Sequence, residues 1–270
     1  MSKSKNNMNT ADYDFVSDNY DQSRSAGLKD SELLFELLNP LSGASILEVG
    51  CGTGNYLKKI YNKSSLVTGL DISRNMLLRT KSKLPGINLI RSNAECLPFP
   101  NKSFDAIYSI QVLHHINDKS KLMSEVYRTL KKGGKFVLQI CTYEQLLTFC
   151  FYYYFTHARD IDFKRFPSIE DIYQKLSFAG FKDISSHLCN IDDAIDDSPS
   201  AYLEKYNRDG CSSFAFLSKE EVEEGCKKVN RDIKSGKVTE VIADLQNKNK
   251  KIGGNATFIK CIKPYNDPRS

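Results

Sequence analysis

The stretch between residues 45 and 141 alternates short apolar runs with segments of helical periodicity. The runs are bounded by turn residues and are short enough to be strands, while the segments between them carry apolar residues at helical spacing. Strands that are joined by helices run in the same direction, which gives a parallel sheet covered on both faces. We therefore predict an α/β chain with a doubly wound, mostly parallel sheet. The predicted strands in this stretch are 45–49, 66–70, 87–90, 105–110 and 136–140.

Local capping signals set the expected ends of the helices between these strands. Ser73 can cap a helix that stops before Pro85, and a shorter helix fits residues 55–61. A third helix is expected over 118–132, because the two lysines and two glycines at 131–134 suit a helix C-terminus.

The regular alternation breaks after Cys141. Residues 142–166 are rich in aromatic side chains, which predicts an insertion over the edge of the sheet. Further along, capping signals begin helices after Ser168 and Ser218. Two more strands, which complete a seven-stranded sheet, are expected at 181–187 and 256–262.

The composition is that of an ordinary globular chain, with 40% hydrophobic and 26% charged residues and a net charge of +5. Lysine and arginine are spread along the chain, and even the cluster at 248–251 is typical of a solvated turn, so we expect no nucleic-acid partner. The most apolar run, 146–155, is about half of the ~20 residues that span a bilayer. No signal peptide is visible, and the eight cysteines include no Cys-x-x-Cys pair. We therefore expect reduced thiols, no metal site and a cytoplasmic protein.

A glycine-rich turn follows the first strand, with glycines at positions 50, 52 and 54. Glycine adopts tight-turn conformations and lacks the Cβ atom that would collide with a ligand close to the backbone. The helix that follows offers unpaired N–H groups to an anionic part of such a ligand. A dinucleotide-binding fingerprint needs glycine at its first, third and sixth positions. The sixth position counted from Gly50 is Asn55, so that fingerprint is absent.

Several short motifs follow this turn in a fixed order, beginning with Asp71 at the end of the second strand. Together with Glu48 and the three glycines, they resemble the ubiquinone/menaquinone-biosynthesis-type, or type 11, family of class I S-adenosylmethionine-dependent methyltransferases. The resemblance covers residues 13–140 and implies a Rossmann-like methyltransferase fold. It also implies S-adenosyl-L-methionine as cofactor and S-adenosyl-L-homocysteine as product. The motifs after Asp71 lie at 93–95, 97–100, 103–105, 112–115 and 130–134.

The resemblance implies which residues hold the methionine end and the ribose of the cofactor. Glu48 and the loop formed by Gly50, Gly52 and Gly54 would hold the methionine end. Asp71 would accept hydrogen bonds from both ribose hydroxyls.

The resemblance also implies which residues contact the adenine and which form a lid over the cofactor. Ile72 would pack on the adenine, and the backbone of Ala94 would contact its edge. Asn93 stands where the family usually has Asp, and its side-chain oxygen can still accept from the adenine amino group. Gln111 would face the cofactor from the other side of the point where the strand order reverses. The lid segment that would close over the cofactor includes Tyr13, Tyr20, Asp21 and Arg24.

His114 and His115 follow the fourth strand. His115 is a candidate general base, because the ordinary pKa of histidine is about 6.5. The alternative is that the pair packs on or caps the next helix. The aromatic run at 149–155 has two interpretations as well, one as core or lid and the other as a wall of the acceptor pocket.

We divide the chain into an N-terminal lid segment (1–30), a cofactor-binding core (31–141) and an acceptor-side region with a helical appendage (142–270). The predicted function is S-adenosylmethionine-dependent methyl transfer to an aromatic or lipophilic small molecule, with O-, N- and C-methylation left open. One alternative is a tRNA or other RNA methyltransferase, because 109–115 also resembles wobble-uridine tRNA methyltransferases, although no RNA-binding module follows Cys141. A second alternative is a non-catalytic, cofactor-binding partner subunit.

Overall fold

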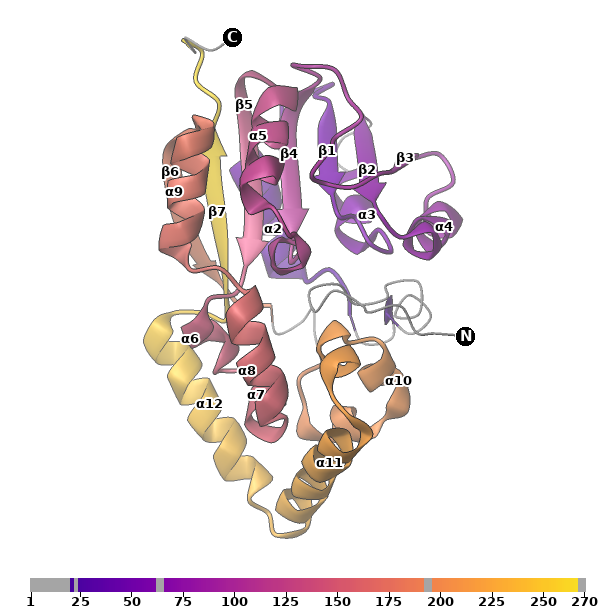
Figure 1. Cartoon of the computed structure of the whole chain (residues 1–270), viewed down its shortest axis with the longest axis vertical. Helices are drawn as coiled ribbons and strands as arrows, with labels where there is room; N and C mark the ends of the chain where they lie inside the picture. Colours follow the sequence, from indigo (N-terminus) through magenta and orange to yellow (C-terminus); the bar gives the residue numbers. More distant parts are fainter. Residues whose placement is uncertain (1–19, 22–23, 62–65, 192–195, 267–270) are drawn as a thin grey trace.

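The computed structural model describes residues 20–21, 24–61, 66–191 and 196–266. Its centre is a seven-stranded sheet with the order β3-β2-β1-β4-β5-β7-β6 (Figure 1). The first five strands are parallel, and β7 runs antiparallel to both of its neighbours. The predicted doubly wound, mostly parallel α/β fold is therefore confirmed. The strands are β1 (Ile46–Val49), β2 (Val67–Asp71), β3 (Asn88–Arg91), β4 (Phe104–Ile110), β5 (Leu130–Ile140), β6 (Lys182–Cys189) and β7 (Ala256–Ile262).

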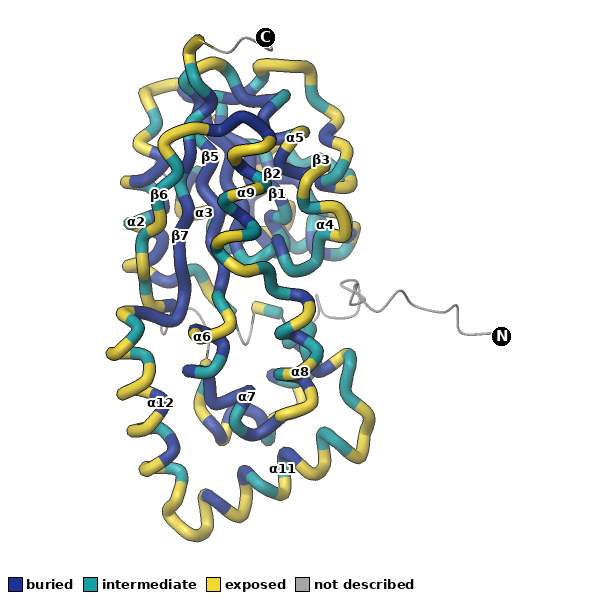
Figure 2. The backbone as a smooth tube through the Cα atoms, turned by 60° about the vertical axis from the view of Figure 1, so that its left-hand side comes forward, coloured by how far each residue is buried: buried dark blue, intermediate teal, exposed yellow. Residues whose placement is uncertain are grey.

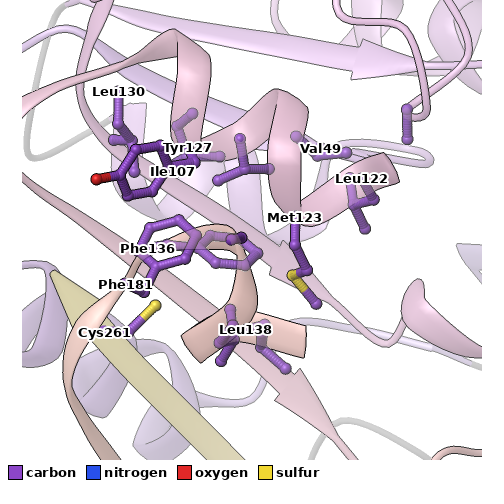
Figure 3. Close-up of a cluster of buried hydrophobic side chains, with 14 of the residues drawn as sticks. Val49, Ile107, Leu122, Met123, Tyr127, Leu130, Phe136, Leu138, Phe181 and Cys261 are labelled. Carbon is purple, nitrogen blue, oxygen red and sulfur yellow. The ribbon is translucent and has the colours of Figure 1, made fainter. Parts of the chain in front are cut away.

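Helices cover both faces of this sheet. One apolar cluster joins α5 and α9 to the sheet, and it includes the edge-to-face pair of Tyr127 and Phe181 (Figure 3). A second cluster joins α2 and α3 to the opposite face. Burial on both faces explains why the central strands read as continuous apolar runs. The flanking helices are α2 (Leu28–Leu38), α3 (Asn55–Tyr61), α4 (Arg74–Lys83), α5 (Lys119–Thr129) and α9 (Ile169–Ala179).

The remaining helices form an appendage at the carboxyl ends of the parallel strands (Figure 1). It has its own apolar cluster, in which aromatic side chains between 149 and 155 pack against Tyr202 and Phe214. The two long helices α11 and α12 carry exposed residues along their length (Figure 2). The elements of the appendage are α6 (Tyr143–Leu146), α7 (Cys150–Tyr154), α8 (Thr156–Arg165), η2 (Pro199–Leu203), α10 (Lys205–Asp209), η3 (Ser212–Phe216), α11 (Lys219–Lys234) and α12 (Val238–Ile252).

Two local predictions were wrong. The helix expected over 118–132 ends at Thr129, because Leu130 already pairs with Phe104 as the first residue of β5. The lysines after it therefore belong to a strand, where Lys131 Nζ lies 2.8 Å from a carboxylate oxygen of Asp105. The basic cluster at 248–251 lies in the last turn of α12 and not in a loop. That helix has few buried apolar positions, Val241 and Leu245 among them, so its pattern in the sequence is weak.

Within the described residues, none of the helices combines the length and the apolarity needed to cross a membrane.

Candidate active site

A cavity of about 490 Å³ lies where the strand order reverses, at the carboxyl ends of β1 and β4. Open parallel sheets bind ligands at this place. One side of the cavity is formed by the loops that follow β1, β2, β3 and β4, and the other side comes from the appendage. One wall of the cavity therefore carries residues of the sequence motifs, and the other wall carries several aromatic side chains.

The glycine turn after β1 forms the floor of this cavity. Gly50 and Gly52 both have positive φ angles, of +75° and +52°, and both line the cavity. A Cβ atom on Gly50 would lie 2.3 Å from Val112, so this position has no room for a side chain. A Cβ atom on Gly52 would meet no atom within 4 Å. A side chain at position 52 would therefore project into space that the turn leaves open.

Asp71 connects the end of β2 to the glycine turn. Its carboxylate accepts from the backbone N–H of Gly52 at 2.8 Å and from that of Ser73 at 2.9 Å. Thr80 of α4 donates to the carbonyl oxygen of Gly52 at 2.7 Å, so that both backbone polar groups of this glycine are held. These contacts fix the turn and keep the Asp71 carboxylate at the wall of the cavity.

Glu48 lies in the interior, at a smaller adjoining cavity of about 60 Å³. Its side chain is almost fully buried, and it accepts a hydrogen bond from the Tyr108 hydroxyl at 2.9 Å. Burial raises the pKa of the Glu48 carboxyl well above its ordinary value, although the Tyr108 hydrogen bond acts in the opposite direction. Arg24 and Tyr20 line both cavities.

The loop after β3 contributes Asn93 and Ala94 to the cavity, and Ile72 lies beside them with an exposed side chain. The oxygen of the Asn93 side chain accepts from the backbone N–H of Glu95 at 2.8 Å. This turn leaves the second lone pair of that oxygen available for a ligand.

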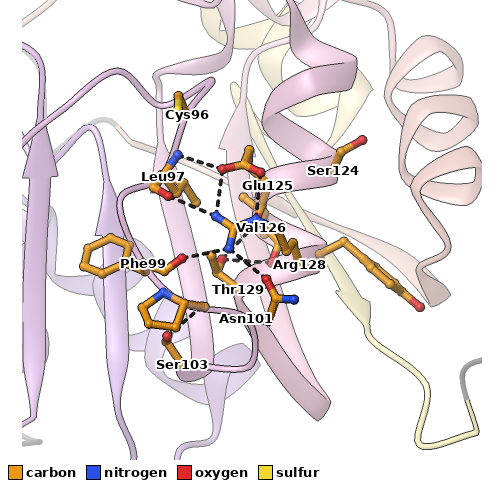
Figure 4. A network of polar contacts seen from close by, with 12 residues as sticks. Cys96, Leu97, Phe99, Asn101, Ser103, Ser124, Glu125, Val126, Arg128 and Thr129 are labelled. Atoms are coloured by element: carbon orange, nitrogen blue, oxygen red, sulfur yellow. Dashed lines mark hydrogen bonds and ion pairs between the residues drawn. The ribbon is translucent and has the colours of Figure 1, made fainter. Parts of the chain in front are cut away.

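A network around Arg128 of α5 holds the continuation of this loop (Figure 4). The Arg128 guanidinium donates to the carbonyl oxygens of Leu97 and Phe99 at 2.9 and 2.7 Å. Glu125 accepts from Arg128 and from the backbone N–H of Leu97 at 2.8 Å. Both partners are partly buried, and the hydrogen bond from Arg128 lowers the pKa of Glu125. The loop that follows the Asn93 turn is thus anchored to a core helix.

Gln111, directly after β4, adopts a φ angle of +53°, which is unusual for a residue other than glycine. Its side-chain N–H group donates to Cys141 Sγ at 3.3 Å and lies 3.4 Å from the Gln139 side-chain oxygen. A strained backbone at this position is typical of functional sites.

His114 and His115 form the short helix η1 (Leu113–His115) and line the cavity. The His114 ring stacks on Phe166 with centroids 4.0 Å apart. The Nδ1 atom of His115 lies 2.9 Å from Arg165 of α8. A guanidinium can only donate, so Nδ1 of His115 is the acceptor and the ring proton of neutral His115 is on Nε2. Burial and the charge of Arg165 lower the pKa of His115 well below its ordinary range.

The appendage wall contains polar residues that the sequence did not single out. The buried carboxylate of Asp197 accepts from the backbone N–H groups of Cys150 and Phe151, at 2.6 and 3.1 Å, and from the Tyr202 hydroxyl. Burial raises the pKa of Asp197 to about 6. Cys150 and Phe151 are 47 and 46 residues away from Asp197 in the sequence, so no local motif reveals these two contacts.

Most of the predicted site residues lie together. Glu48 lines only the smaller cavity, and Gly54 lines neither, since its backbone packs against Thr80. Tyr13 lies outside the described residues. The assignment of these residues to parts of a cofactor, and of His115 to catalysis, remains a prediction. The predicted residues that line the main cavity are Tyr20, Gly50, Gly52, Asp71, Ile72, Asn93, Ala94, Gln111 and His115.

Comparison with known proteins agrees with this architecture. Residues 47–138 match the family model described as a methyltransferase domain. A malonyl-[acyl-carrier protein] O-methyltransferase of Buchnera aphidicola is 30% identical over 164 residues, which cover 61% of each chain. A phthiotriol/phenolphthiotriol dimycocerosates methyltransferase of Mycobacterium ulcerans is 38% identical over 99 residues, or 35% of this chain and 36% of its own length. This chain thus spans less than two thirds of these relatives.

A solved structure supports the fold over a longer part of the chain. A candidate methyltransferase from an antibiotic biosynthesis pathway of Anabaena variabilis has a TM-score of 0.75 and 23% identity, and the match covers 89% of this chain and 99% of that one. The sheet, the switch-point cavity and the matched segment together define a class I S-adenosylmethionine-dependent methyltransferase domain. Residues 47–138 carry the type 11 form of this domain.

Proposed function

We propose that this protein transfers a methyl group from S-adenosyl-L-methionine to a small organic acceptor with an apolar or aromatic skeleton. The observation that carries the proposal is the open cradle at Gly52, next to the carboxylate of Asp71 and to the buried carboxyl of Glu48. The residues present suit such a cofactor, because one acid can accept hydrogen bonds from the amino group of its methionine end and another can accept them from its ribose hydroxyls. The cofactor supplies a methyl group made electrophilic by a positively charged sulfur.

The residues of the chain would divide the binding in the following way. Glu48 would accept from the amino group of the methionine end, and Asp71 from the ribose hydroxyls. Asn93 and Ala94 would face the adenine, with Ile72 packed on it. Glu48 and Asp71 lie within β1 and β2, and the other residues come directly or shortly after a strand, so the sheet positions all of them.

The aromatic wall of the cavity suits an apolar acceptor. Phe149, Phe151 and Tyr202 line it from the appendage. By covering the acceptor these side chains would exclude water and hold the reacting atoms in line, which are the main contributions that a protein makes to methyl transfer.

The test is calorimetric titration of the full-length protein with S-adenosylhomocysteine, followed by turnover assays with a labelled methyl donor. We expect a single binding site that Asp71→Ala weakens by about tenfold or more, because the variant loses ribose contacts. The matched control is Asp244→Ala on the exposed face of α12, which should leave affinity unchanged. Absence of binding by the wild-type protein would reject the proposal.

A further inference from the structure

One acid on the appendage wall of the cavity has no counter-charge within the described part of the chain. The carboxylate of Asp197 accepts from the backbone N–H groups of Cys150 and Phe151 and from the Tyr202 hydroxyl. All three of these donors are neutral, and no described side chain forms an ion pair with Asp197. Arg24 is the one arginine or lysine among the described residues of the lining, and it does not pair with this acid either.

The three hydrogen bonds leave the Asp197 carboxylate with one acceptor site that no described group uses. An ionised carboxyl group has about four lone-pair sites, two on each oxygen. Oδ1 accepts two of the hydrogen bonds, while Oδ2 accepts one, from the N–H group of Cys150 at 2.6 Å. Asp197 lines the main cavity, so a ligand bound there can reach it. A donor on that ligand would complete the hydrogen bonds of the carboxylate.

Aromatic side chains share the appendage wall with this acid. Phe151 and Tyr202 are its direct hydrogen-bond partners, and both line the cavity with Phe149 and Tyr152. The face of an aromatic ring attracts a cation, and groups of such rings recognise ammonium ligands in proteins. The wall therefore combines a carboxylate without an ionic partner with the type of side chain that stabilises a positive charge.

The proposed cofactor leaves this acid unused. In the proposed function Glu48 faces the amino group of the methionine end and Asp71 faces the ribose. Glu95, on the loop after β3, accepts from the backbone N–H of Asn117 at 3.0 Å and lies on the side of the adenine. Asp197 comes from the appendage, which forms the opposite side of the cavity. Among the described acids of the lining, it is therefore the one on the acceptor side.

On the basis of the proposed function, we infer that the methyl acceptor carries a positively charged nitrogen, which binds to the Asp197 carboxylate against the aromatic wall. An ammonium group can donate to the open site on Oδ2, and it balances a charge that has no ionic partner in the free protein. A hydroxyl group can make the hydrogen bond but brings no charge, and a carboxylate would be repelled. The role of Asp197 is recognition, so it requires no covalent step.

The ionisation of Asp197 should make this recognition depend on pH. Burial raises the pKa of Asp197 to about 6 in the free protein, and its exposed neighbour Asp196 acts in the same direction. The other titratable groups that face it are the Cys150 thiol of α7 and the Tyr202 phenol of η2. Burial raises the pKa of Cys150 to about 12 and that of Tyr202 well above its ordinary value, so both stay neutral near pH 7. A cation binds the ionised carboxylate, so its affinity should increase as the pH rises through about 6.

The first experiment measures binding to the full-length protein saturated with S-adenosylhomocysteine. Three matched probes are compared on each of two skeletons: 3-phenylpropylamine, 3-phenylpropanol and 3-phenylpropanoate, and octylamine, octanol and octanoate. At about pH 7.5 we expect at least one amine to bind about tenfold or more tightly than its matched alcohol and carboxylate. A smaller preference on both skeletons would overturn the inference, and so would no amine binding on either.

A variant separates the charge of Asp197 from its part in the shape of the wall. Asp197→Asn removes the charge at nearly the same volume, so the preference for the amine over the alcohol should fall about tenfold. The increase in amine affinity near pH 6 should also disappear. The alcohol reports on the shape of the wall, because it has the same skeleton without the charge. The matched control is Asp196→Asn at the exposed neighbouring position, which should keep both the preference and the pH dependence.

Two results would reject a cation site at Asp197. If Asp197→Asn weakens the binding of amine and alcohol alike, this residue only holds the wall in place. If the affinity of the wild-type protein for the amine does not change across pH 6, the ionised carboxylate is not its partner. The second measurement needs no variant, so it decides the question even if Asp197→Asn fails to fold.

The outcome distinguishes this inference from the function on which it rests. If the wild-type protein does not bind S-adenosylhomocysteine, the proposed function fails. If it binds that compound but shows no preference for amines, only the inference about the acceptor fails.

Discussion

At the scale of single residues, the site depends on a backbone conformation that mainly glycine adopts and on a carboxyl group in an interior position. Gly52 has a left-handed backbone, and Glu48 is a carboxyl group buried beside a phenol. The glycines and Glu48 stand close together in the sequence, so the turn and a candidate acid beside it could be predicted, but the burial of Glu48 against Tyr108 could not. The partner of His115 was not predictable in this way, because Arg165 lies fifty residues further along the chain.

Gly52→Val should abolish or strongly reduce the binding of S-adenosylhomocysteine. Its side chain would occupy the cradle, and its backbone would be strained at positive φ by about 1–2 kcal/mol. Gly236→Val is the matched control, since Gly236 also has positive φ and open space around it, but lies between α11 and α12. Calorimetry should show a loss of affinity in the first variant alone. Equal affinity in both variants would contradict the assignment of the space at Gly52 to the cofactor.

Glu48→Gln should affect folding stability and affinity for S-adenosylhomocysteine differently. The pKa of Glu48 is raised in the folded protein, so its contribution to folding stability falls as the pH rises above the unfolded value of about 4.3. Gln removes this penalty, and the melting temperature at pH 7 should rise or stay the same. Affinity for S-adenosylhomocysteine should fall about tenfold, because the charge that would face the amino group is lost.

The same acid should give a proton signature. If Glu48 is protonated in the free protein and ionised beside the ligand's ammonium group, binding at pH 7 releases a proton and affinity increases with pH. Calorimetry in two buffers with different ionisation enthalpies measures this release. Identical proton release in wild type and Glu48→Gln would show that another group is responsible.

At the scale of elements, the ends of a helix or strand could be predicted where the residues that fix them are close together in the sequence. Helix α11 is capped by Ser218, whose capping box with Glu221 is formed in both directions as the sequence indicates. The end of α5 was mispredicted because a cross-strand partner, Phe104, decides where β5 begins. Strand β7 was predicted at its observed bounds, while α12 was missed since it buries little apolar surface.

Arg128→Met should weaken the attachment of the loop after β3 to helix α5. The carbonyl oxygens of Leu97 and Phe99 would lose a charged donor, and the free energy of unfolding should fall by about 1–3 kcal/mol. Denaturant unfolding measures this change. Lys121→Met, on the exposed side of the same helix, is the control and should shift it by less than about 0.5 kcal/mol. Equal effects of both variants would argue against the anchoring role of Arg128.

At the scale of the whole molecule, positive charge is widely distributed and often paired. Lys175, Lys205 and Lys248 each form an ion pair with an aspartate one helical turn away. We therefore expect no retention of tRNA in filter binding at about 50 mM salt. Tight binding with a steep dependence on salt concentration would instead favour the RNA methyltransferase alternative.

The strand order also has a consequence for the time at which the molecule can be completed during synthesis. Strand β6 lies at the edge of the sheet, and its one neighbour in the described sheet is β7. The strands from β1 to β5 can pair as soon as they leave the ribosome, but β6 has to wait until 256–262 have been made. The nascent chain therefore carries an unpaired edge at β5 and an unattached β6 while the whole of α10, α11 and α12 is being translated. An unpaired edge of this kind invites association with other chains, so the last strand of the sheet determines how long a new copy is exposed to aggregation.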